Sequence, residues 1–463
     1  MSSSFYSIDP RTGARIATYD ATDKDSLEDK LNRVYRSAKE WRGTELDLRA
    51  AGLRQLGILL EQDRERLALL ASNEMGKHLE EALSEVDKCS QLCRVLPDQA
   101  ARALAPKPVA LDDAHARIRA VPLGVILGLM PWNFPYWQVA RFALPALAAG
   151  NVCLLKHAAN VQGCAEAFCE LVHQAFGRND LLVNLRLDNE AAEALIADKR
   201  VAGVSLTGST GAGKAVGAAA GEAIKPAVLE LGGNDPYVVL ADADLELTLE
   251  ACVAGRLLNA GQSCISAKRL IVVEALAERF AERLMSELQA WTFLTSDRTQ
   301  DAEQQLAPMA RADLREDLHQ QVQNSIAKGA KCSLGGKLPT AEGYWYPVTL
   351  LTDVAPGMPA FDEELFGPVV SVIPARDKAH AIQLANQSSF GLGAAIFTRD
   401  VVEGERIARD EIHAGSCFVN TFVRSHVDLP FGGIRQSGYG RELTEAGIQA
   451  FCNLKTTYVH LGV

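Results

Sequence analysis

Apolar residues recur at helical spacing through most of the first hundred positions of the chain. This period predicts helices over residues 23–41 and 45–104. The period then changes to two, because residues 114–121 (AHARIRAV) alternate apolar and polar side chains. That alternation predicts an edge strand. Residues 455–461 (KTTYVHL), close to the end of the sequence, predict a second one.

Between these two segments, short apolar runs alternate with helical stretches. Such alternation is typical of parallel βαβ units, so it predicts an α/β fold. We expect two α/β domains with a boundary near Gly232 and Gly233. The predicted strands cover residues 124–130, 152–155, 181–187, 201–206, 226–230 and 237–240, and the alternation resumes over residues 270–419.

Length and charge narrow the possible functions. A chain of 463 residues exceeds what one hydrophobic core usually supports. The formal net charge of -11 disfavours binding to nucleic acid or to an anionic membrane surface. We find no secretory or transit signal and no apolar run long enough to span a membrane, so we expect a cytoplasmic protein. The 10 cysteines are scattered without a CxxC pair, and we expect no metal site.

A glycine-rich turn, residues 207–214 (TGSTGAGK), follows a predicted strand and opens a predicted helix. Backbone N–H groups at such a turn can bind a phosphate. The triphosphate-binding motif GxxxxGK[ST] fails here at Ala215, which lacks the hydroxyl needed for Mg²⁺. The dinucleotide motif GxGxxG also fails, because Gly208 and Gly211 lie three residues apart. Composition alone leaves a phosphate site and a structural turn equally open.

Three polar residues lie where a cleft is expected. Cys264 occupies a loop between a helix and a strand, Glu230 ends a strand before two glycines, and Asn133 is fixed between two prolines. A thiol, a carboxylate and a side-chain amide can act as nucleophile, general base and oxyanion donor. Taken singly, each also has an ordinary explanation: a buried thiol, a strand-end carboxylate and a turn residue.

The order of these motifs resembles the aldehyde dehydrogenase superfamily, and the resemblance covers nearly the whole chain. Cys264 lies 34 residues after Glu230, as in the family pattern. The motifs are PWNFP (131–135), Lys156, TGSTGAG (207–213), ELGG (230–233), GQSC (261–264), EELFGP (363–368), Asn420 and PFGGIRQSGYGRE (430–442).

The resemblance implies an aldehyde dehydrogenase-like α/β fold in three parts. The first is a Rossmann-type NAD(P)-binding domain, formed by residues 1–103 and 123–232. The second is an α/β catalytic domain over residues 233–442. The third is a small β oligomerisation segment, residues 104–122 and 443–463, through which we expect a homodimer or a homotetramer.

The resemblance also implies the roles of individual residues. Cys264 would attack an aldehyde, Glu230 would act as general base, and Asn133 with the Cys264 backbone N–H would stabilise the oxyanion. Ala159 stands where many NAD-preferring relatives have Glu, so its neutral side chain leaves both NAD and NADP open as cofactors. The residues expected to bind the cofactor are Trp132, Lys156, Ala159, Gly208, Ser209, Leu231, Glu364 and Phe366.

The aldehyde is suggested by Arg141, eight residues after Asn133. The local sequence looks most like bacterial succinate-semialdehyde dehydrogenases, which place a carboxylate-binding Arg at this position. Their second Arg, six residues before the nucleophile, is Leu258 here, and its possible replacements are Arg256, Arg424, Ser425 and His426. A Cys that some relatives have two residues after the nucleophile is Ser266, so we expect no disulfide switch of that kind.

Other functions remain open at this point. Glutarate semialdehyde or an aliphatic or aromatic aldehyde could replace succinate semialdehyde as the substrate. A phosphotransferase with a triphosphate-binding loop is a different class of enzyme, and Ala215 argues against it. A non-catalytic protein on the same fold is the third alternative, and the presence of Cys264, Glu230 and Asn133 argues against it.

Overall fold

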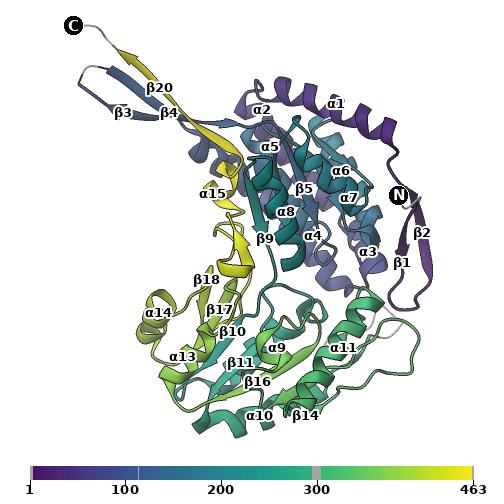
Figure 1. Ribbon diagram of the computed structural model, residues 1–463, viewed down its shortest axis with the longest axis vertical. Coiled ribbons are helices and arrows are strands. Elements are labelled where there is room, and N and C mark those ends of the chain that lie inside the picture. Colours follow the sequence, from purple (N-terminus) through teal and green to yellow (C-terminus); the bar gives the residue numbers. More distant parts are fainter. Residues whose placement is uncertain (1–3, 113, 295–303, 461–463) are drawn as a thin grey trace.

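A six-stranded sheet forms the core of the upper lobe in Figure 1. The structure is a computed structural model that describes residues 4–112, 114–294 and 304–460. The strand order of this sheet is β19-β9-β8-β5-β6-β7, and all neighbours run parallel except β19, which is antiparallel to β9. Its strands are β5 (Val125–Met130), β6 (Val152–His157), β7 (Leu182–Asn184), β8 (Val201–Thr207), β9 (Ala227–Glu230) and β19 (Gly438–Tyr439).

A seven-stranded sheet forms the core of the lower lobe, with the order β14-β15-β16-β11-β10-β17-β18. Only β14 is antiparallel to its neighbour. The predicted division near residues 232 and 233 falls between β9 and β10, the nearest strands of the two sheets in sequence. The strands are β10 (Pro236–Val239), β11 (Arg269–Val273), β14 (Lys331–Leu334), β15 (Thr349–Thr352), β16 (Val369–Ala375), β17 (Gly393–Phe397) and β18 (Ser416–Val419).

Helices cover both sheets. All residues of α5 are buried, and this helix packs against β5 and β6. The helices between β5 and β10 are α5 (Trp137–Ala149), α6 (Gln162–Phe176), α7 (Asn189–Ala197) and α8 (Thr210–Glu222). Those after β10 are α9 (Leu245–Leu257), α10 (Glu274–Gln289), α11 (Ala312–Ala327), α12 (Pro359–Asp362), α13 (Lys378–Asn386), α14 (Val401–Asp410) and α15 (Thr444–Gln449).

The N-terminal helical region is divided more finely than its periodicity suggests. The predicted helical stretch 45–104 contains three helices, because the chain turns at Asp63 and again at Gly76. Gly76 has a φ of 78° and ends a helix in the left-handed conformation that glycine favours. The four helices are α1 (Lys24–Trp41), α2 (Leu46–Gln62), α3 (Arg64–Met75) and α4 (Leu79–Leu104).

Two smaller sheets complete the fold. The two predicted edge segments form β4 (Ala114–Pro122) and β20 (Cys452–His460), which pair antiparallel with each other. The strand β3 (Lys107–Ala110) pairs with the other side of β4, so β4 is the central strand and not an edge. This three-stranded sheet projects away from both lobes (Figure 1). A hairpin of β1 (Ser4–Ile8) and β2 (Arg15–Asp20) was not predicted. Residues 1–3 and 461–463, which belong to the predicted segments 1–103 and 443–463, lie outside the described residues.

Two further short strands, β12 (Thr292–Phe293) and β13 (Gln305–Leu306), pair parallel with each other. Within the described part of the chain, no helix is long and apolar enough to cross a membrane. The same residues contain no group of three or more His, Cys, Asp or Glu side chains arranged to hold a metal ion.

Candidate active site

The loop that carries Cys264 begins with a strained left-handed turn. α9 ends at Leu257, and the next turn contains Asn259 and Ala260 with φ values of 55° and 52°. Non-glycine residues seldom adopt this conformation, and strain of this kind gathers at functional sites. Gly261 continues the turn so close to the carbonyl of Gly367 that a Cβ there would clash with it. The GQSC loop is therefore seated directly on the EELFGP loop.

The GQSC loop also contacts the ELGG turn. A Cβ on Gly233 would lie 2.5 Å from the carbonyl oxygen of Cys264, so only glycine permits the observed approach. A Cβ on Gly232 would collide with the carboxylate of Glu364. Three motifs that are distant in sequence thus meet around one point.

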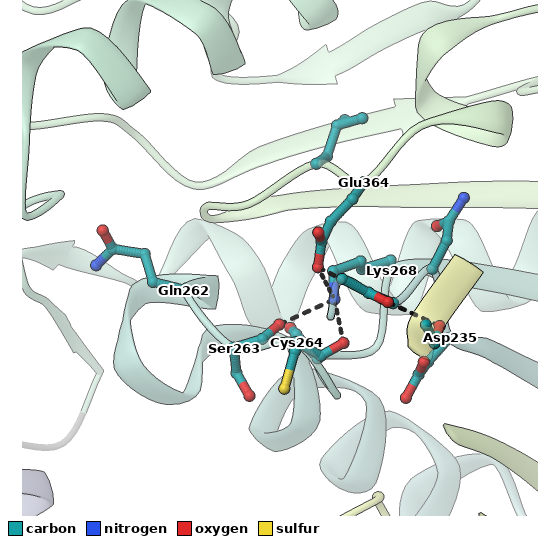
Figure 2. Close-up of polar contacts among 12 residues, drawn as sticks. Asp235, Gln262, Ser263, Cys264, Lys268 and Glu364 are labelled. Atoms are coloured by element: carbon teal, nitrogen blue, oxygen red, sulfur yellow. Dashed lines mark hydrogen bonds and ion pairs between the residues drawn. The ribbon is translucent and has the colours of Figure 1, made fainter. Parts of the chain in front are cut away.

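Lys268 lies at that point (Figure 2). Its side chain is 1% exposed. Its ammonium donates hydrogen bonds to the carbonyl oxygens of Ser263 (2.9 Å) and Cys264 (2.6 Å). The same nitrogen lies 3.2 Å from Oε1 of Glu364, which also accepts from the backbone N–H of Gly233 at 3.1 Å. One buried cation therefore joins the nucleophile loop to the EELFGP loop.

Asn133 is held by hydrogen bonds at both ends of its amide. Its Nδ2 donates to the carbonyl of Gln262 (3.1 Å), and its Oδ1 accepts from Nε2 of Gln138 (3.4 Å). Oε1 of Gln138 in turn accepts from Arg141 at 2.6 Å. Since Nδ2 carries two hydrogens, one remains for an oxyanion near the GQSC loop. The amide is thus held in a fixed orientation through a chain of side chains from α5.

The thiol of Cys264 is half-buried, and burial raises its pKa to about 12. The positive charges of Arg141 and Lys268 act in the opposite direction and favour the thiolate. A thiol with a raised pKa is mostly protonated at neutral pH. It therefore needs a base or an additional positive charge before it can attack.

Glu230 is 2% exposed at the end of β9. Burial and the neighbouring Glu442 carboxylate raise the pKa of Glu230 well above its ordinary value, while Arg141 and Arg441 oppose the shift. Neither carboxylate oxygen of Glu230 has a hydrogen-bond partner among the described residues. A carboxylate with a raised pKa and no hydrogen-bond partner among the described residues has the properties of a general base.

A cavity of about 300 Å³ opens beside Cys264. Its wall includes two predicted substrate residues, Arg141 and Ser425, but neither Glu230 nor Asn133. Arg141 is 2% exposed, forms an ion pair with Glu442 and lies 4.2 Å over the ring of Phe431. Most of the wall comes from α4, α5 and residues 423–425, and its members include Glu81, Glu85, Lys88, Phe134, Trp137, Gln138, Leu258, Ile265, Val423 and Arg424.

The cavity narrows the choice of a second substrate-binding residue. Arg256 is fully buried, and its guanidinium donates to the carbonyls of Val369, Leu365 and Gly367. Arg256 therefore stabilises the backbone of the EELFGP loop and is not part of the cavity wall. Arg424 and Ser425 lie on the cavity wall, whereas Arg256 and His426 do not. Ser266, two residues after the nucleophile, accepts from Arg256 and donates to the carbonyl of Gly255, so its hydroxyl is part of this support.

The sequence did not single out Lys88, Lys268 or Glu442. Lys88 is one of many charged residues on a long amphipathic helix, and nothing in its spacing distinguishes it. Lys268 did carry a signal, since a charged residue directly precedes the fully buried strand β11. Glu442 ends the PFGGIRQSGYGRE motif, and only the fold brings it to Arg141 and Glu230.

The predicted cofactor residues follow the carboxyl ends of neighbouring parallel strands. Trp132 comes after β5, Lys156 is the next-to-last residue of β6, Gly208 and Ser209 follow β8, and Leu231 follows β9. Dinucleotides bind at this edge of open α/β sheets. Ser209 caps α8 by accepting from the backbone N–H of Ala212 (3.2 Å), so the positive end of the helix lies beside Gly208.

Several polar groups at this edge fit a dinucleotide. Oγ1 of Thr207 is buried without a hydrogen-bond partner among the described residues. The contacts of Glu364 with Gly233 and Lys268 both engage Oε1, so Oε2 is left for a ribose hydroxyl within the part of the chain that the structure describes. Lys156 donates to Oδ1 of Asn189 at 3.0 Å. Ala159 is exposed, and Trp132 meets Phe366 edge to face at 5.9 Å.

His157 supports the PWNFP segment. Burial lowers its pKa to about 4, so the ring is neutral. Its Nε2 lies 2.8 Å from the carbonyl of Pro135, and Nδ1 accepts from the backbone N–H of Ala158 (2.9 Å). These contacts fit the tautomer with the proton on Nε2, which donates to Pro135.

Comparison with known proteins identifies the family. The model of the aldehyde dehydrogenase family matches residues 1–457. The chain belongs to this family. Membership confirms the predicted fold and the predicted enzyme class, and it removes the support for a phosphotransferase.

Similar proteins of this family come from several bacteria. The chain is 42% identical over 452 residues to succinate semialdehyde dehydrogenase [NAD(P)+] Sad of Escherichia coli, covering 98% of this chain and 97% of that one. It is 41% identical over 459 residues to succinate-semialdehyde dehydrogenase [NADP(+)] of Mycobacterium leprae, covering 98% and 100%. The crystal structure of succinic semialdehyde dehydrogenase from Streptococcus pyogenes in complex with NADP+ superposes with a TM-score of 0.95 at 35% identity, covering 98% and 100%.

Proposed function

We propose that this aldehyde dehydrogenase oxidises succinate semialdehyde to succinate, with NAD+ or NADP+ as the acceptor. The observation that carries the proposal is the cavity beside Cys264, whose wall contains Arg141 and Ser425. A short aldehyde with a carboxylate at its far end would fill such a cavity with its charge against these side chains. The relatives described above carry the same activity in their names.

Cys264 would be the nucleophile. Its thiolate attacks the carbonyl carbon, a C–S bond forms, and the carbonyl oxygen becomes the oxyanion of a thiohemiacetal. The free Nδ2 hydrogen of Asn133 and the Cys264 backbone N–H would stabilise that oxyanion, with about 2.7–4 kcal/mol for each donor. Bound NAD(P)+ supplies the acceptor for the hydride that leaves the same carbon. A thioester on Cys264 remains.

Glu230 would complete the cycle as general base. It takes a proton from a water molecule, the resulting oxygen attacks the thioester carbon, and the Cys264 thiolate leaves with the electron pair of the C–S bond. The raised pKa of Glu230 suits this step, since a higher pKa makes the carboxylate a stronger base toward water. The same carboxylate can accept the thiol proton of Cys264 before the attack.

The cofactor would lie along the carboxyl edge of the six-stranded sheet. Gly208 and Ser209 would bind its pyrophosphate at the start of α8, and Glu364 would bind the nicotinamide ribose. Lys156 would bind the adenosine ribose, while Trp132, Leu231 and Phe366 would pack against the dinucleotide. Ala159 presents no carboxylate to a 2′-phosphate, which supports the use of NADP as well as NAD.

The projecting sheet supports an oligomer, either a homodimer or a homotetramer. The strands β3 and β20 expose large apolar side chains, among them Val109 (39%), Leu454 (62%), Tyr458 (52%) and Val459 (53%). Contact with a second copy would bury these side chains. We also propose that residues 1–103 with 123–232 act as the cofactor domain and 233–442 as the catalytic domain in a cytoplasmic enzyme.

Steady-state kinetics test the substrate. The kcat/KM for succinate semialdehyde is compared with those for glutarate semialdehyde, butanal and benzaldehyde, using NAD+ and NADP+ separately. Butanal has the same chain length without the carboxylate, so the ratio of succinate semialdehyde to butanal measures recognition of the charge. We expect a ratio of about 100 or more, as for a charge-assisted pair in a desolvated pocket. A ratio near one would overturn the proposal.

Two variants separate the roles around Arg141. Arg141→Met removes the charge and lowers the ratio. Gln138→Leu cuts the link to Asn133 while Arg141 remains, so it lowers kcat/KM for both aldehydes and preserves the ratio. An unchanged kcat/KM for succinate semialdehyde in Arg141→Met would show that Arg141 does not bind the carboxylate.

A further inference from the structure

We propose that Lys88 of α4, with Ser425, supplies the second half of the substrate-carboxylate site and so determines specificity for a charged aldehyde. This inference rests on the proposed function and specifies how the cavity recognises the carboxylate. Lys88, Ser425, Arg141 and Cys264 all lie on the wall of the same cavity.

Lys88 is held over the cavity by neighbouring side chains. Its Nζ donates to Oγ of Ser425 at 2.6 Å and lies 4.4 Å over the ring of Trp137. Nε1 of Trp137 also donates to the same Oγ, at 3.2 Å. These contacts fix an otherwise flexible lysine, which lowers the entropy lost when it binds a ligand.

These contacts leave the hydroxyl of Ser425 free to act only as a hydrogen-bond donor. An Oγ atom has two lone pairs and one hydrogen. Lys88 and Trp137 occupy both lone pairs, so the hydrogen of Ser425 is available only for donation. The ammonium of Lys88 has two further hydrogens. Together the two residues offer three N–H or O–H donors and no acceptor, which suits a carboxylate and not a neutral alkyl end.

Among the buried and half-buried cations on the cavity wall, Lys88 is the one whose charge is least neutralised by neighbouring carboxylates. Arg141 is paired with Glu442. Glu85 is paired with Lys77, and its Oε1 accepts from the backbone N–H groups at the start of α5. Glu81 accepts from the N–H of Asn259, and burial raises its pKa.

Lys88, in contrast, has no ion-pair partner among the described residues, and Glu80, the remaining acid of the wall, is exposed. Burial together with the positive charges of Arg141 and Arg424 lowers the pKa of Lys88 to about 8, while Cys89 and Glu85 act in the opposite direction. A substrate carboxylate would provide the missing negative charge.

Lys88 could also supply the positive charge that the missing second arginine would provide. Leu258, which stands at that position, lies on the wall of the same cavity as Lys88. Arg256 cannot take its place, because its guanidinium is used by the EELFGP loop. Lys88 comes from a different element, α4, and therefore meets the substrate from another side of the cavity.

The test is the ratio of kcat/KM for succinate semialdehyde to that for butanal in wild type, Lys88→Met and Ser425→Ala. A general loss of activity cancels in this ratio. We expect Lys88→Met to lower it by about 10- to 100-fold and Ser425→Ala by about 5-fold or more, chiefly through KM. Lys30→Met is the matched control: Lys30 is also half-buried with a lowered pKa, but it bonds to the carbonyl of Asn184.

The pH dependence of the ratio gives a second readout. Lys88 loses its charge as the pH rises through about 8, while the substrate carboxylate stays ionised. The ratio should therefore fall above pH 8 in wild type and stay flat in Lys88→Met. The titration of Cys264 and Glu230 affects both aldehydes alike and cancels. If Lys88→Met does not fold, Lys88→Gln keeps a polar contact with Ser425 and serves the same comparison.

The outcomes distinguish the two proposals. A wild-type ratio near one contradicts the proposed function, whatever Lys88 does. A high wild-type ratio that Lys88→Met and Ser425→Ala leave unchanged overturns the role of Lys88 and leaves the proposed function standing. A high ratio that falls in both variants, and not in Lys30→Met, supports both.

Discussion

The ammonium of Lys268 lies 3.2 Å from Oε1 of Glu364 and at the same time binds the carbonyl oxygen of Cys264. The residue proposed to hold the nicotinamide ribose and the proposed nucleophile are thus joined through one side chain. A shift of either loop would be transmitted to the other. Lys268 acts as a positioning residue in this arrangement, because it contacts the backbone of the nucleophile loop and the side chain of Glu364.

Replacing Lys268 by Met should disorder the nucleophile loop. The carbonyl oxygen of Cys264 loses the donor that Lys268 provides, whereas Ser263 keeps the N–H of Ser266 and Glu364 keeps the N–H of Gly233. A buried group left unpaired costs about 1–3 kcal/mol. We expect a lower melting temperature and a kcat/KM reduced by about 100-fold, since small misplacements of reacting groups have effects of this size. Alkylation of Cys264 by iodoacetamide should slow as well, because a charge that favours the thiolate is lost.

Lys225→Met provides the control for Lys268. Lys225 also donates to two carbonyl oxygens, those of Ile196 and Asp198, both at 2.6 Å, but it lies after α8. The substitution Lys225→Met should lower the melting temperature without changing the alkylation rate of Cys264. Equal alkylation rates in Lys268→Met and wild type would show that Lys268 does not position the thiol.

Ala159→Glu should shift the cofactor preference toward NAD. Ala159 is exposed in a short 3-10 turn after β6, so the change does not disturb the core. A carboxylate there would repel a 2′-phosphate, and like charges a few ångströms apart near a surface cost about 1 kcal/mol or more. The ratio of kcat/KM with NADP+ to that with NAD+ should fall at least about fivefold. Ala159→Gln has similar size without the charge and should keep the wild-type ratio.

Glu442→Gln should move the pH dependence of thioester hydrolysis to lower pH. The Glu442 carboxylate raises the pKa of Glu230, and removing its charge also leaves Arg141 unpaired. Both changes favour the ionised form of Glu230, so the base becomes active at lower pH. Single-turnover hydrolysis rates between pH 5 and 9 measure the shift. A shift in the opposite direction would show that Glu442 does not act on Glu230 through its charge.

His157 should make the protein less stable in mild acid. Its pKa in the folded protein, about 4, is below the ordinary value of 6.5. Below pH 6.5 His157 is therefore protonated in the unfolded chain but stays neutral in the folded protein, so the free energy of unfolding decreases as the pH falls. Between pH 7.5 and 5.0 this one group accounts for about 2 kcal/mol of unfolding free energy.

Denaturant unfolding of His157→Gln at both pH values checks the prediction. The variant should be less stable at pH 7.5, because it loses the contacts to Pro135 and Ala158, but it should lose less on acidification. The same loss on acidification in both proteins would assign the pH dependence to other groups.

The sequence predicted the repeating layers of this fold well, because buried parallel strands are continuous apolar runs such as residues 125–130 and 201–206. It did not predict the hairpin of β1 and β2, whose faces are partly exposed and lack a clear alternation. It also assigned residues 438–439 to the catalytic segment, whereas the structure pairs them with β9 of the first sheet. Strand pairing between distant segments is not encoded in local spacing.

The candidate site was predictable where a motif carries it. Glu230, Cys264 and Glu364 were all found from short motifs, and the structure brings their loops into contact through Gly232 and Gly233. Their chemical roles stay predictions.

Lys88 and Lys268 could not be found in this way. Their significance lies in what surrounds them, a hydroxyl on a loop more than three hundred residues away in one case and two carbonyls in the other. Sequence periodicity places such residues on a helix or before a strand but does not reveal their partners.

The contact between Gly233 and the carbonyl of Cys264 has a consequence for how the enzyme could acquire new substrates. At this contact the loops that would perform the chemistry leave no room for a side chain larger than that of glycine, so substitutions there would disrupt the site. The walls contributed by α4 and residues 423–425 touch the cavity without entering that junction. Laboratory evolution toward neutral or longer aldehydes should therefore accumulate its productive substitutions on those two walls, while the junction stays invariant.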